Sequence, residues 1–376
     1  MSTDERIQPV NENRLKVTVI GAGNGGKSMA AEMATRGFEV TLYNRTAENI
    51  AAIRLISSIE LTTEDGRQLT GNLACVTTDL GEAVTGAHLI MVVIPASGHR
   101  DIALAAAPYL TDDQIVVLNP GRTCGALEFV QGLRKGGCTN HPIICEAETF
   151  LFAARSMGPA QARIFRTKYS VPVAALPTLH TEKALAVIRQ VYPQFIPAKS
   201  VLHTSLNNMG AVFHPALTLL NAGWIERTHG DFEFYMDGVT RGTAKVLEAL
   251  DRERVTVAAA CGIRAQTARE WLHRAYAADG DNLYEAMHAN QGYSGIKAPN
   301  QLQHRYIFEE IPCSLIPISE LGRQYGVDTP TVHSLIHLAT IIHGRDFWRE
   351  GRTLDRLGIK GLSVQELHRY VDTGER

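Results

Sequence analysis

The feature that most constrains this chain is a glycine-rich turn near its beginning. Residues 19–30 read VIGAGNGGKSMA and contain the pattern G-x-G-x-x-G. A β-branched run at 15–20 precedes the turn, and a helical pattern over 24–36 follows it. A strand, this turn and a helix in that order are the context in which the motif binds a dinucleotide. The residues that we expect to contact the cofactor's pyrophosphate are Gly21, Gly23, Asn24, Gly25 and Gly26.

The rest of the first half alternates apolar strand patterns with helical ones. Further strand patterns lie at 38–44, 87–95, 114–120, 142–148 and 168–177, and helical patterns lie at 99–110 and 125–135. Apolar strands that alternate with helices indicate a parallel sheet covered on both faces. We therefore expect an α/β fold with an N-terminal Rossmann-type, doubly wound sheet.

The second half has a different character. After four prolines between 172 and 197, strand patterns become scarce. Helical patterns dominate instead, at 208–223, 238–262, 265–278, 315–326, 329–344 and, for a short last helix, 363–371. A chain of 376 residues exceeds the usual size of one domain. We expect residues 1–190 to form the dinucleotide-binding domain and residues 191–376 to form a mostly α-helical substrate domain.

Composition and charge exclude several other classes of protein. Hydrophobic residues make up 45% and charged residues 20% of the chain, and the net charge is −2. These values are typical of a globular protein and give no basic bias towards nucleic acid or an anionic membrane. The polar first 14 residues hold no secretory h-region, and the apolar runs are too short to span a bilayer. We expect a cytoplasmic protein.

No metal site is expected. The six cysteines form no C-x-x-C pair, which favours reduced thiols over a disulfide framework or a zinc site. His333 and His337 stand four residues apart on a predicted helix, but no H-E-x-x-H motif or third ligand accompanies them.

The end of the second strand bears on the choice of cofactor. NAD enzymes usually have Asp or Glu there to bind the ribose 2′-hydroxyl, but this chain has Asn44, Arg45 and Thr46. Arginine can pair with a 2′-phosphate, so we expect NADP(H) to be preferred and NAD(H) to be the alternative, with Glu48 arguing for the latter. Pro95 ends another strand, where it either shapes the nicotinamide pocket or simply stops the strand.

Two stretches of the second half carry candidate catalytic groups. His214 lies in the apolar helical pattern NNMGAVFHP, and RYIFEE contains Arg305, Glu309 and Glu310. A histidine can carry a proton in both directions near neutral pH, and a neighbouring carboxylate would raise its pKa and fix its tautomer. An arginine fork can hold a substrate carboxylate. Taken alone, a histidine on an apolar helix face is more often a core residue, and a run such as RYIFEE is more often a salt-bridged helix end.

Taken together, these motifs resemble the octopine/nopaline (opine) dehydrogenase family over nearly the whole chain. The resemblance rests on GAGNGGKSMAAEMA, VVIPASGH, LNPGRTCGALEF, NNMGAVFHP and RYIFEEIPCSLIPISEL. It implies an enzyme that reductively condenses an α-keto acid with the amino group of an amino acid. A nicotinamide cofactor would reduce the resulting imine to a secondary amine dicarboxylate.

The resemblance also implies roles for residues. His214 matches the family's catalytic histidine, and Arg305 matches the arginine that binds a substrate carboxylate. Glu310 stands where the family usually has an aspartate partner for the histidine; glutamate is one methylene longer, so Glu309 is the alternative partner. Asn208 and Glu148 are further expected substrate contacts. Two other departures are Lys27, where a neutral residue is usual, and the absence of an acid at 44–46.

Two other functions are weighed against this one. Reductases of the 3-hydroxyacid, glycerol-phosphate or ketopantoate type usually place a lysine on the first helix of the second domain, and no lysine lies between Lys199 and Lys245. A nicotinamide-binding redox sensor without turnover would not need His214, Arg305 and Glu310 together. The expected partners are thus a small amino acid and an α-keto acid. A homodimer is compatible with a largely helical second domain.

Overall fold

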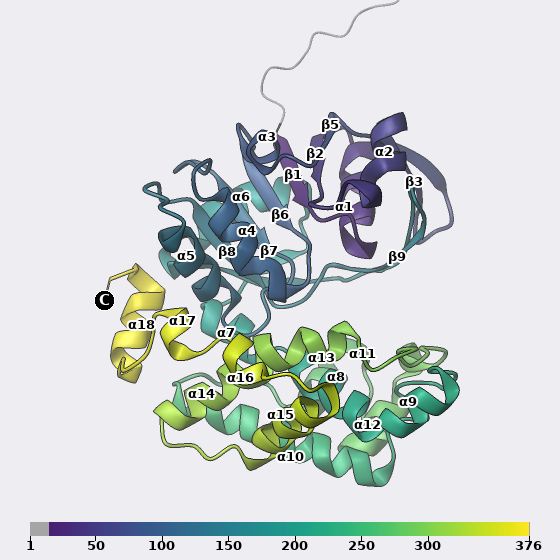
Figure 1. Cartoon of the computed structure of the whole chain (residues 1–376), viewed down its shortest axis with the longest axis vertical. Coiled ribbons are helices and arrows are strands. Elements are labelled where there is room, and N and C mark those ends of the chain that lie inside the picture. The colour runs from purple at the N-terminus through teal and green to yellow at the C-terminus, as the bar shows by residue number, and fades with distance from the viewer. Residues whose placement is uncertain (1–14, 376) are drawn as a thin grey trace, which may run out of the picture. The chain divides into compact units, whose positions relative to one another are not determined.

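The structure is a computed structural model of the chain that describes residues 15–375. The chain forms two compact units (Figure 1). Unit 1 consists of the chain up to Val93 together with Phe152–Thr167. Unit 2 consists of Ile94–Leu151 and the chain from Lys168 onward.

Unit 1 contains the predicted glycine turn and the strands around it. Its four parallel strands follow the order β6-β1-β2-β5. They are β1 (Lys16–Ile20), β2 (Glu39–Tyr43), β5 (Cys75–Thr77) and β6 (Leu89–Val92). The core residues Val17, Val19 and Ile20 of β1 are fully buried, as expected for a strand with parallel neighbours on both sides. The helix α1 (Asn24–Thr35) starts just after the turn.

A second sheet of unit 1 has no counterpart in the sequence predictions. Its strands, in the order β4-β3-β10-β9, are β3 (Ser58–Thr62), β4 (Gln68–Asn72), β9 (Phe152–Gly158) and β10 (Gln161–Thr167). The helix α1 packs against both sheets (Figure 1). These strands were missed because exposed polar and charged residues interrupt their apolar pattern, so the sequence lacks a continuous strand signal.

Unit 2 contains four more strands, whose order is β7-β8-β11-β12. They are β7 (Ile115–Leu118), β8 (Ile143–Ala147), β11 (Val171–Leu176) and β12 (Phe195–Pro197). The expected parallel arrangement holds for β7–β8 and β11–β12, but β11 runs antiparallel to β8. The reason is that β9 and β10 separate β8 from β11 in the sequence, so no right-handed helical crossover joins the two strands.

Three helices accompany these strands in the sequence: α4 (His99–Ala106), α5 (Gly125–Lys135) and α6 (Thr181–Val191). After Pro197, the described chain consists of helices and loops, which confirms the predicted change from strands to helices. The main helices there are α7 (Val201–Leu206), α8 (Gly210–Leu220), α10 (Arg241–Ala260), α11 (Ala268–Tyr276), α12 (Leu283–Ala289), α14 (Ile316–Gln324) and α15 (Pro330–His343).

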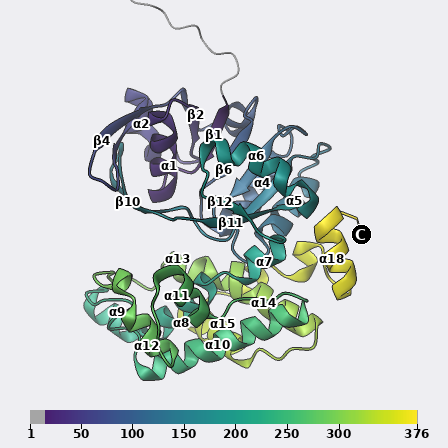
Figure 2. The same ribbon diagram turned by 180° about the vertical axis from the view of Figure 1, so that it is seen from behind.

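The helix α8 lies at the centre of the helical part of unit 2. It packs against α10, α15 and the short helix α13 (Arg305–Phe308) (Figure 2). It also packs against η5 (Ile311–Leu315), a π-helical turn between α13 and α14. Such turns often occur at functional sites. The sequence places Glu309 and Glu310 between α13 and η5, so the fold brings both carboxylates close to α8.

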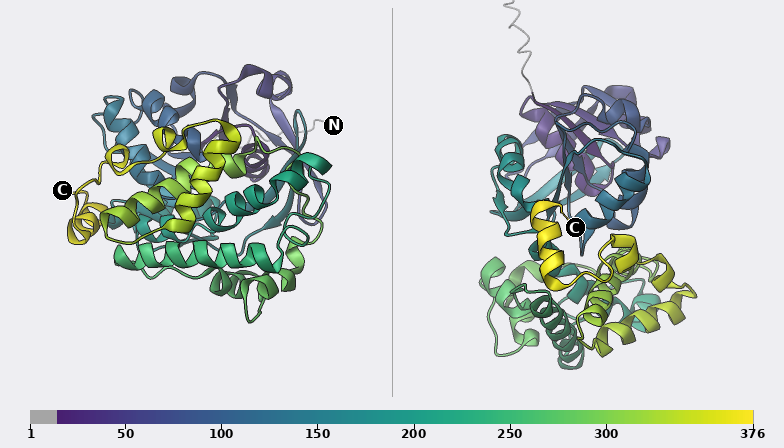
Figure 3. Two further views of the ribbon diagram at one scale, coloured as in Figure 1. Left: turned by 60° about the horizontal axis from the view of Figure 1, so that its bottom comes forward. Right: turned by 90° about the vertical axis from the view of Figure 1, so that its left-hand side faces the viewer.

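The last part of the chain returns to the strand-bearing part of unit 2. It contains α16 (Phe347–Glu350), α17 (Leu354–Leu357) and α18 (Val364–Thr373), drawn in yellow in Figure 3. The helix α17 packs on α5, and α18 packs on η3 (Thr178–His180). Between residues 15 and 375, no helix combines the length and apolar character that a membrane span requires.

Candidate active site

The glycine turn of unit 1 has the geometry of a dinucleotide site. Gly21 has a φ of +112°, which only glycine adopts without strain. A Cβ on Gly26 would lie 1.7 Å from the Gly21 carbonyl oxygen, so a side chain there would push α1 away from β1. A Cβ on Gly23 would meet nothing within 4 Å, which leaves room for a ligand. The positive end of α1 begins at this open position and therefore suits a pyrophosphate.

The helix α1 is tied to β9 by two of its first residues. Asn24 Oδ1 accepts a hydrogen bond of 2.9 Å from the Ser156 N–H. Lys27 Nζ donates to Ser156 Oγ at 3.0 Å and to the Gly158 carbonyl at 3.2 Å. Burial lowers the pKa of Lys27. Lys27 is therefore explained by the second sheet of unit 1, and the Asn24 side chain holds that sheet rather than pointing freely at a cofactor.

The three polar residues at the end of β2 differ in their surroundings. Asn44 Oδ1 accepts from the Ala22 N–H at 3.1 Å, and Asn44 Nδ2 donates to the Thr46 carbonyl at 2.9 Å. The Asn44 amide thus braces the glycine turn, and the second hydrogen of its Nδ2 remains as a donor for a 2′-phosphate. Arg45 and Thr46 are exposed at the same strand end and keep their side chains available.

A histidine–glutamate pair lies in the helical part of unit 2. His214 projects from α8, and its Nδ1 lies 2.7 Å from Glu310 Oε1. Of the two expected alternatives, Glu310 rather than Glu309 contacts the histidine. Because an ionised carboxylate only accepts hydrogen bonds, Nδ1 carries the proton, and Nε2 of the neutral ring is left as the acceptor. Nε2 forms no hydrogen bond with any residue in the range 15–375.

The surroundings of His214 keep its ring oriented and neutral. The ring stacks on Tyr306, with centroids 4.0 Å apart and planes 11° apart. Burial lowers the pKa of His214, and the contact with Glu310, which raises that pKa, does not fully offset the effect of burial. The carboxylate therefore acts on the pKa of His214 in the direction expected from the sequence, but the loss of water around the ring has the larger effect.

An arginine that the sequence argument did not single out completes this cluster. Arg122 NH1 lies 3.0 Å from Glu310 Oε1, and Arg122 Nε lies 3.2 Å from Glu309 Oε1. Burial raises the pKa of both carboxyls, but the Arg122 charge and the other hydrogen bonds and charges around them together outweigh it, so both pKa values end below their ordinary range. Arg122 is the largest of these contributions to keeping the two buried carboxylates ionised. The available signal was the motif NPGRTCG at the end of a strand, where doubly wound sheets bind ligands.

The start of α8 is packed tightly around this cluster. A Cβ on Gly210 would lie 2.4 Å from Arg122 NH1 and 2.5 Å from Glu310 Oε1, so the cluster requires glycine there. Asn208 Oδ1 accepts from Arg122 NH1 at 3.3 Å, and Asn208 Nδ2 donates to Ser314 Oγ at 2.9 Å. Asn208 is buried with its amide engaged. Asn208 therefore holds Arg122, and its contact with a substrate stays a prediction.

Arg305 differs from Arg122 in being free to bind an anion. It is exposed, and within the described part of the chain its guanidinium forms no ion pair. Its Cζ lies 5.9 Å from the centroid of the Tyr306 ring, which stacks on His214. The charge of Arg305 also lowers the pKa of His214. Arg305 is thus a cation near the histidine that forms no ion pair within residues 15–375.

Glu148 lies just after β8 in a largely buried position. Burial raises its pKa to about 7, and its closest cation is Arg274, at 3.7 Å. The neighbouring Lys168 donates to Thr149 Oγ1 at 2.8 Å, and burial lowers its pKa to about 8. Glu148 therefore sits beside two cations of unit 2.

Pro95 lies exposed before the short turn η2 (Ala96–Gly98). The Ala96 N–H donates to Glu309 Oε1 at 3.0 Å, so the carboxylate that pairs with Arg122 also holds this turn.

His333, which stands four residues before His337, shares a hydrogen bond of 2.6 Å with Ser319 Oγ, which gives it a structural partner.

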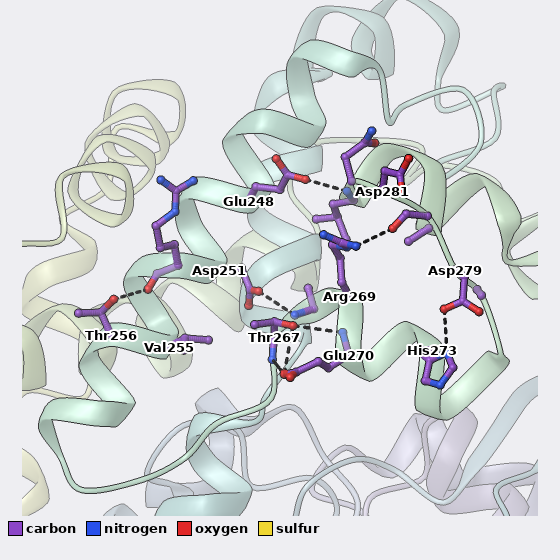
Figure 4. A pocket seen from close by; sticks show the side chains of 17 residues that line it. Glu248, Asp251, Val255, Thr256, Thr267, Arg269, Glu270, His273, Asp279 and Asp281 are labelled. Atoms are coloured by element: carbon purple, nitrogen blue, oxygen red, sulfur yellow. Dashed lines mark hydrogen bonds and ion pairs between the residues drawn. The ribbon is translucent and has the colours of Figure 1, made fainter.

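A separate cavity of about 800 Å³ lies between α10, α11 and α12 (Figure 4). Its charged side chains are used at helix ends. Asp251 accepts from the Ala268 N–H, Glu248 accepts from the Leu283 N–H, and Glu270 caps α11. No residue of the predicted site lines this cavity.

Comparisons with known proteins agree with this geometry. Residues 197–343 match the family model described as the NAD/NADP octopine/nopaline dehydrogenase α-helical domain. Residues 16–135 match the N-terminal part of NAD-dependent glycerol-3-phosphate dehydrogenase. An opine dehydrogenase of Arthrobacter sp. (strain 1C) is 37% identical over 354 residues, which is 94% of this chain and 98% of the relative.

Solved structures share the fold. An octopine dehydrogenase in complex with NADH and L-arginine has a TM-score of 0.79 and 22% identity, covering 96% of this chain and 98% of the other. An NADP+-bound yersinopine dehydrogenase has a TM-score of 0.71 and 15% identity, with the same coverage.

The glycine turn, the histidine–carboxylate pair and these relatives define an NAD(P)-dependent oxidoreductase that acts on CH–NH donors. The chain belongs to the octopine/nopaline (opine) dehydrogenase family. This family couples an α-keto acid to the amino group of an amino acid by reductive condensation.

Proposed function

We propose that His214 is the general acid/base of this condensation, with Glu310 as its partner and Arg305 as the clamp for a substrate carboxylate. The observation that carries the proposal is the 2.7 Å contact between His214 Nδ1 and Glu310, with Nε2 left free. A neutral histidine with a fixed tautomer can take a proton from the substrate's ammonium group and return it to the departing hydroxyl. Glu310 stabilises the imidazolium that forms in between.

The other residues of the cluster act on charge and orientation. Arg122 keeps Glu310 ionised, and Arg305 holds the keto acid so that its carbonyl carbon faces the amine. We propose that the largely buried Glu148 contacts the amino acid substrate. When bound, the reduced nicotinamide supplies the hydride that converts the imine to a secondary amine.

The preferred cofactor is NADP(H), with NAD(H) as the alternative. The exposed Arg45 and Thr46 at the end of β2 support this, because a guanidinium can pair with a 2′-phosphate and no carboxylate directly follows the strand to repel it. Relatives of this fold have been solved with either cofactor: the yersinopine dehydrogenase with NADP+ and the octopine dehydrogenase with NADH.

The substrate classes follow those named for the structural neighbours. The octopine dehydrogenase structures hold L-arginine, agmatine or pyruvate. For this chain we propose an amino acid and a short α-keto acid as the pair. A panel of both classes, offered singly and in pairs with NADPH or NADH, tests the proposal. Cofactor oxidation that needs both substrates supports it, and oxidation with a keto acid alone would replace it with a hydroxyacid reductase.

Three broader features are also proposals. The division between a cofactor domain, 1–190, and a substrate domain, 191–376, is supported by the last strand ending at Pro197 and by the helical family model beginning at 197. A cytoplasmic location is supported by six free thiols. A homodimer is supported by the exposed apolar side chains Leu338, Ile341 and Ile342 on α15. Light scattering of the purified protein would measure the last of these.

A further inference from the structure

A fully buried arginine lies behind the catalytic cluster and belongs to none of the motifs above. Arg352 connects α16 to α17, and its side chain is 0% exposed. Its Nε lies 2.6 Å from Glu128 Oε2 on α5, which supplies the counter-charge. A buried ion pair alone is weak support for a function, because an apolar pair of the same size often stabilises a fold equally well. The remaining contacts of Arg352 are what call for an explanation.

Apart from a 3.4 Å contact between NH2 and His99 Nδ1, these contacts go to backbone carbonyls on either side of the catalytic cluster. Arg352 NH1 donates to the Gly121 carbonyl at 2.9 Å and to the Thr123 carbonyl at 2.8 Å, which are the two neighbours of Arg122. Arg352 NH2 donates to the Ala96 carbonyl at 3.2 Å. The Ala96 N–H in turn binds Glu309. One guanidinium thus braces the turn that carries Arg122 and the turn held by Glu309.

The turn that carries Arg122 needs such a brace. Arg122 has a φ of +62° and Cys124 a φ of +61°, in the left-handed region that costs a residue with a side chain about 1 kcal/mol. This conformation accompanies an Arg122 side chain placed between Glu309 and Glu310. Without the two hydrogen bonds from Arg352, the turn can relax to negative φ and carry the guanidinium away from Glu310.

The third backbone segment that Arg352 contacts is the π-helical turn η5. The Thr123 N–H donates to the Cys313 carbonyl at 3.2 Å, and Arg352 NH1 lies 3.4 Å from the same oxygen. The Arg352 N–H donates to the Pro312 carbonyl at 2.9 Å. Pro312 and Cys313 lie two and three residues after Glu310 in the sequence, so Arg352 fixes the backbone on both sides of the ion pair between Arg122 and Glu310.

We propose that Arg352 is a positioning residue of the reaction: it holds the Gly121–Thr123 turn and η5 so that Arg122 stays paired with Glu310 and His214 keeps its partner. It does not touch the substrate. The proposal rests on the proposed function of His214, but its structural part can be tested without turnover.

Arg356 provides a matched control, since it pairs with the other oxygen of Glu128 but contacts none of the carbonyls around Arg122. The test compares Arg352→Lys with Arg356→Met. Lysine keeps the charge but not the planar fork that reaches several carbonyls at once. We expect Arg352→Lys to lower kcat about 100-fold while the KM for the cofactor stays within about twofold, because a misplacement of about 1 Å costs that much. Arg356→Met should lower the melting temperature but leave kcat within about threefold.

A second measurement separates positioning from stability. Glu310 raises the pKa of His214 and Arg122 lowers it, so displacement of either group should change that pKa. Titration of the His214 ring by NMR, without substrates, should therefore show a shifted pKa in Arg352→Lys and no change in Arg356→Met. If Arg352→Lys does not fold, the isosteric Glu128→Gln should give the same direction of change with a smaller size.

Failure of the proposed function and failure of the positioning role of Arg352 give different results. If the wild type oxidises no cofactor with any substrate pair, the proposed function fails, and the NMR titration still tests the positioning role. An unchanged kcat and an unchanged pKa of His214 in folded Arg352→Lys would overturn the inference. Equal losses of kcat in Arg352→Lys and Arg356→Met would also overturn it, because the shared ion pair with Glu128 would then be the cause.

Discussion

The substitution Glu310→Gln tests the catalytic pair most sharply. It keeps the size of the side chain and an oxygen that can accept the Nδ1 proton of His214, but it removes the charge. Glu310 Oε1 lies 2.7 Å from His214 Nδ1 and 3.0 Å from Arg122 NH1. After the change, a protonated His214 would face the Arg122 cation without the intervening carboxylate.

The size of the effect follows from this geometry. Two unit charges about 4 Å apart interact by about 4 kcal/mol at the effective dielectric constant near a protein surface. The retained hydrogen bond and local relaxation reduce the loss to about 3 kcal/mol in the transition state. Since about 1.4 kcal/mol is a tenfold change in rate, kcat/KM should fall about 100-fold.

The pH dependence of kcat/KM shows in which direction the pKa of His214 changes. Glu310 raises the pKa of His214 in the wild type, so its removal lowers that pKa further. If the neutral ring must accept a proton, the acid limb of kcat/KM moves to lower pH in Glu310→Gln, even though the maximum is lower. Initial rates between pH 5 and 9, with both substrates varied, measure both effects.

Glu309→Gln is the matched control, because Glu309 pairs with the same Arg122 but does not contact His214. We expect it to lower kcat/KM less than about tenfold and to shift the acid limb less. The reasoning is refuted if Glu310→Gln stays within about threefold of the wild type, or if its acid limb moves to higher pH.

Three other predictions concern the substrate clamp, the cofactor and stability. Arg305→Met should raise the KM for the keto acid about 30-fold through the loss of a charge-assisted hydrogen bond, with little change in the KM for the cofactor; an unaltered keto-acid KM would remove Arg305 from the site. Arg45→Asp should shift the preference from NADPH to NADH, whereas Arg54→Asp, at another exposed arginine, should not. If Arg45→Asp still prefers NADPH, another residue binds the 2′-phosphate. Burial lowers the pKa of His99 to about 3, so below the ordinary value of 6.5 the unfolded chain binds a proton that the folded chain does not. The free energy of unfolding should therefore lose about 1.4 kcal/mol per pH unit from this group as the pH falls from 6.5 to 3, and urea titrations should find a shallower slope in His99→Gln; an equal slope would show that His99 is not the cause.

The parts of the site that are local in sequence could be predicted from it. The glycine turn follows its strand directly, so its role was clear from spacing alone. His214 and Glu310 each lie in a distinctive motif, and the resemblance to a family paired them. Their separation in space, 2.7 Å, nevertheless had to come from the fold, since their positions in the sequence are 96 residues apart.

The parts that depend on burial and distant contacts could not be predicted. Arg122 binds carboxylates 187 and 188 residues away, as the differences 309 − 122 and 310 − 122 show, and nothing near it in sequence marks it as buried. The position of Asn44 at a strand end predicted a cofactor contact, but did not show that its amide also braces the turn next to it. Arg352 has no motif around it, and only the packing of the last helices reveals its contacts.

The central claim is that hydride reaches the carbon that joins the two substrates. The most direct test is a reaction with nicotinamide cofactor doubly deuterated at C4, an amino acid and a keto acid, followed by mass spectrometry and NMR of the product. The account predicts a secondary amine with one deuterium on the carbon derived from the keto carbonyl, formed by the wild type and about 100-fold more slowly by Glu310→Gln. Deuterium found in a 2-hydroxy acid, with the amino acid unchanged, would contradict it.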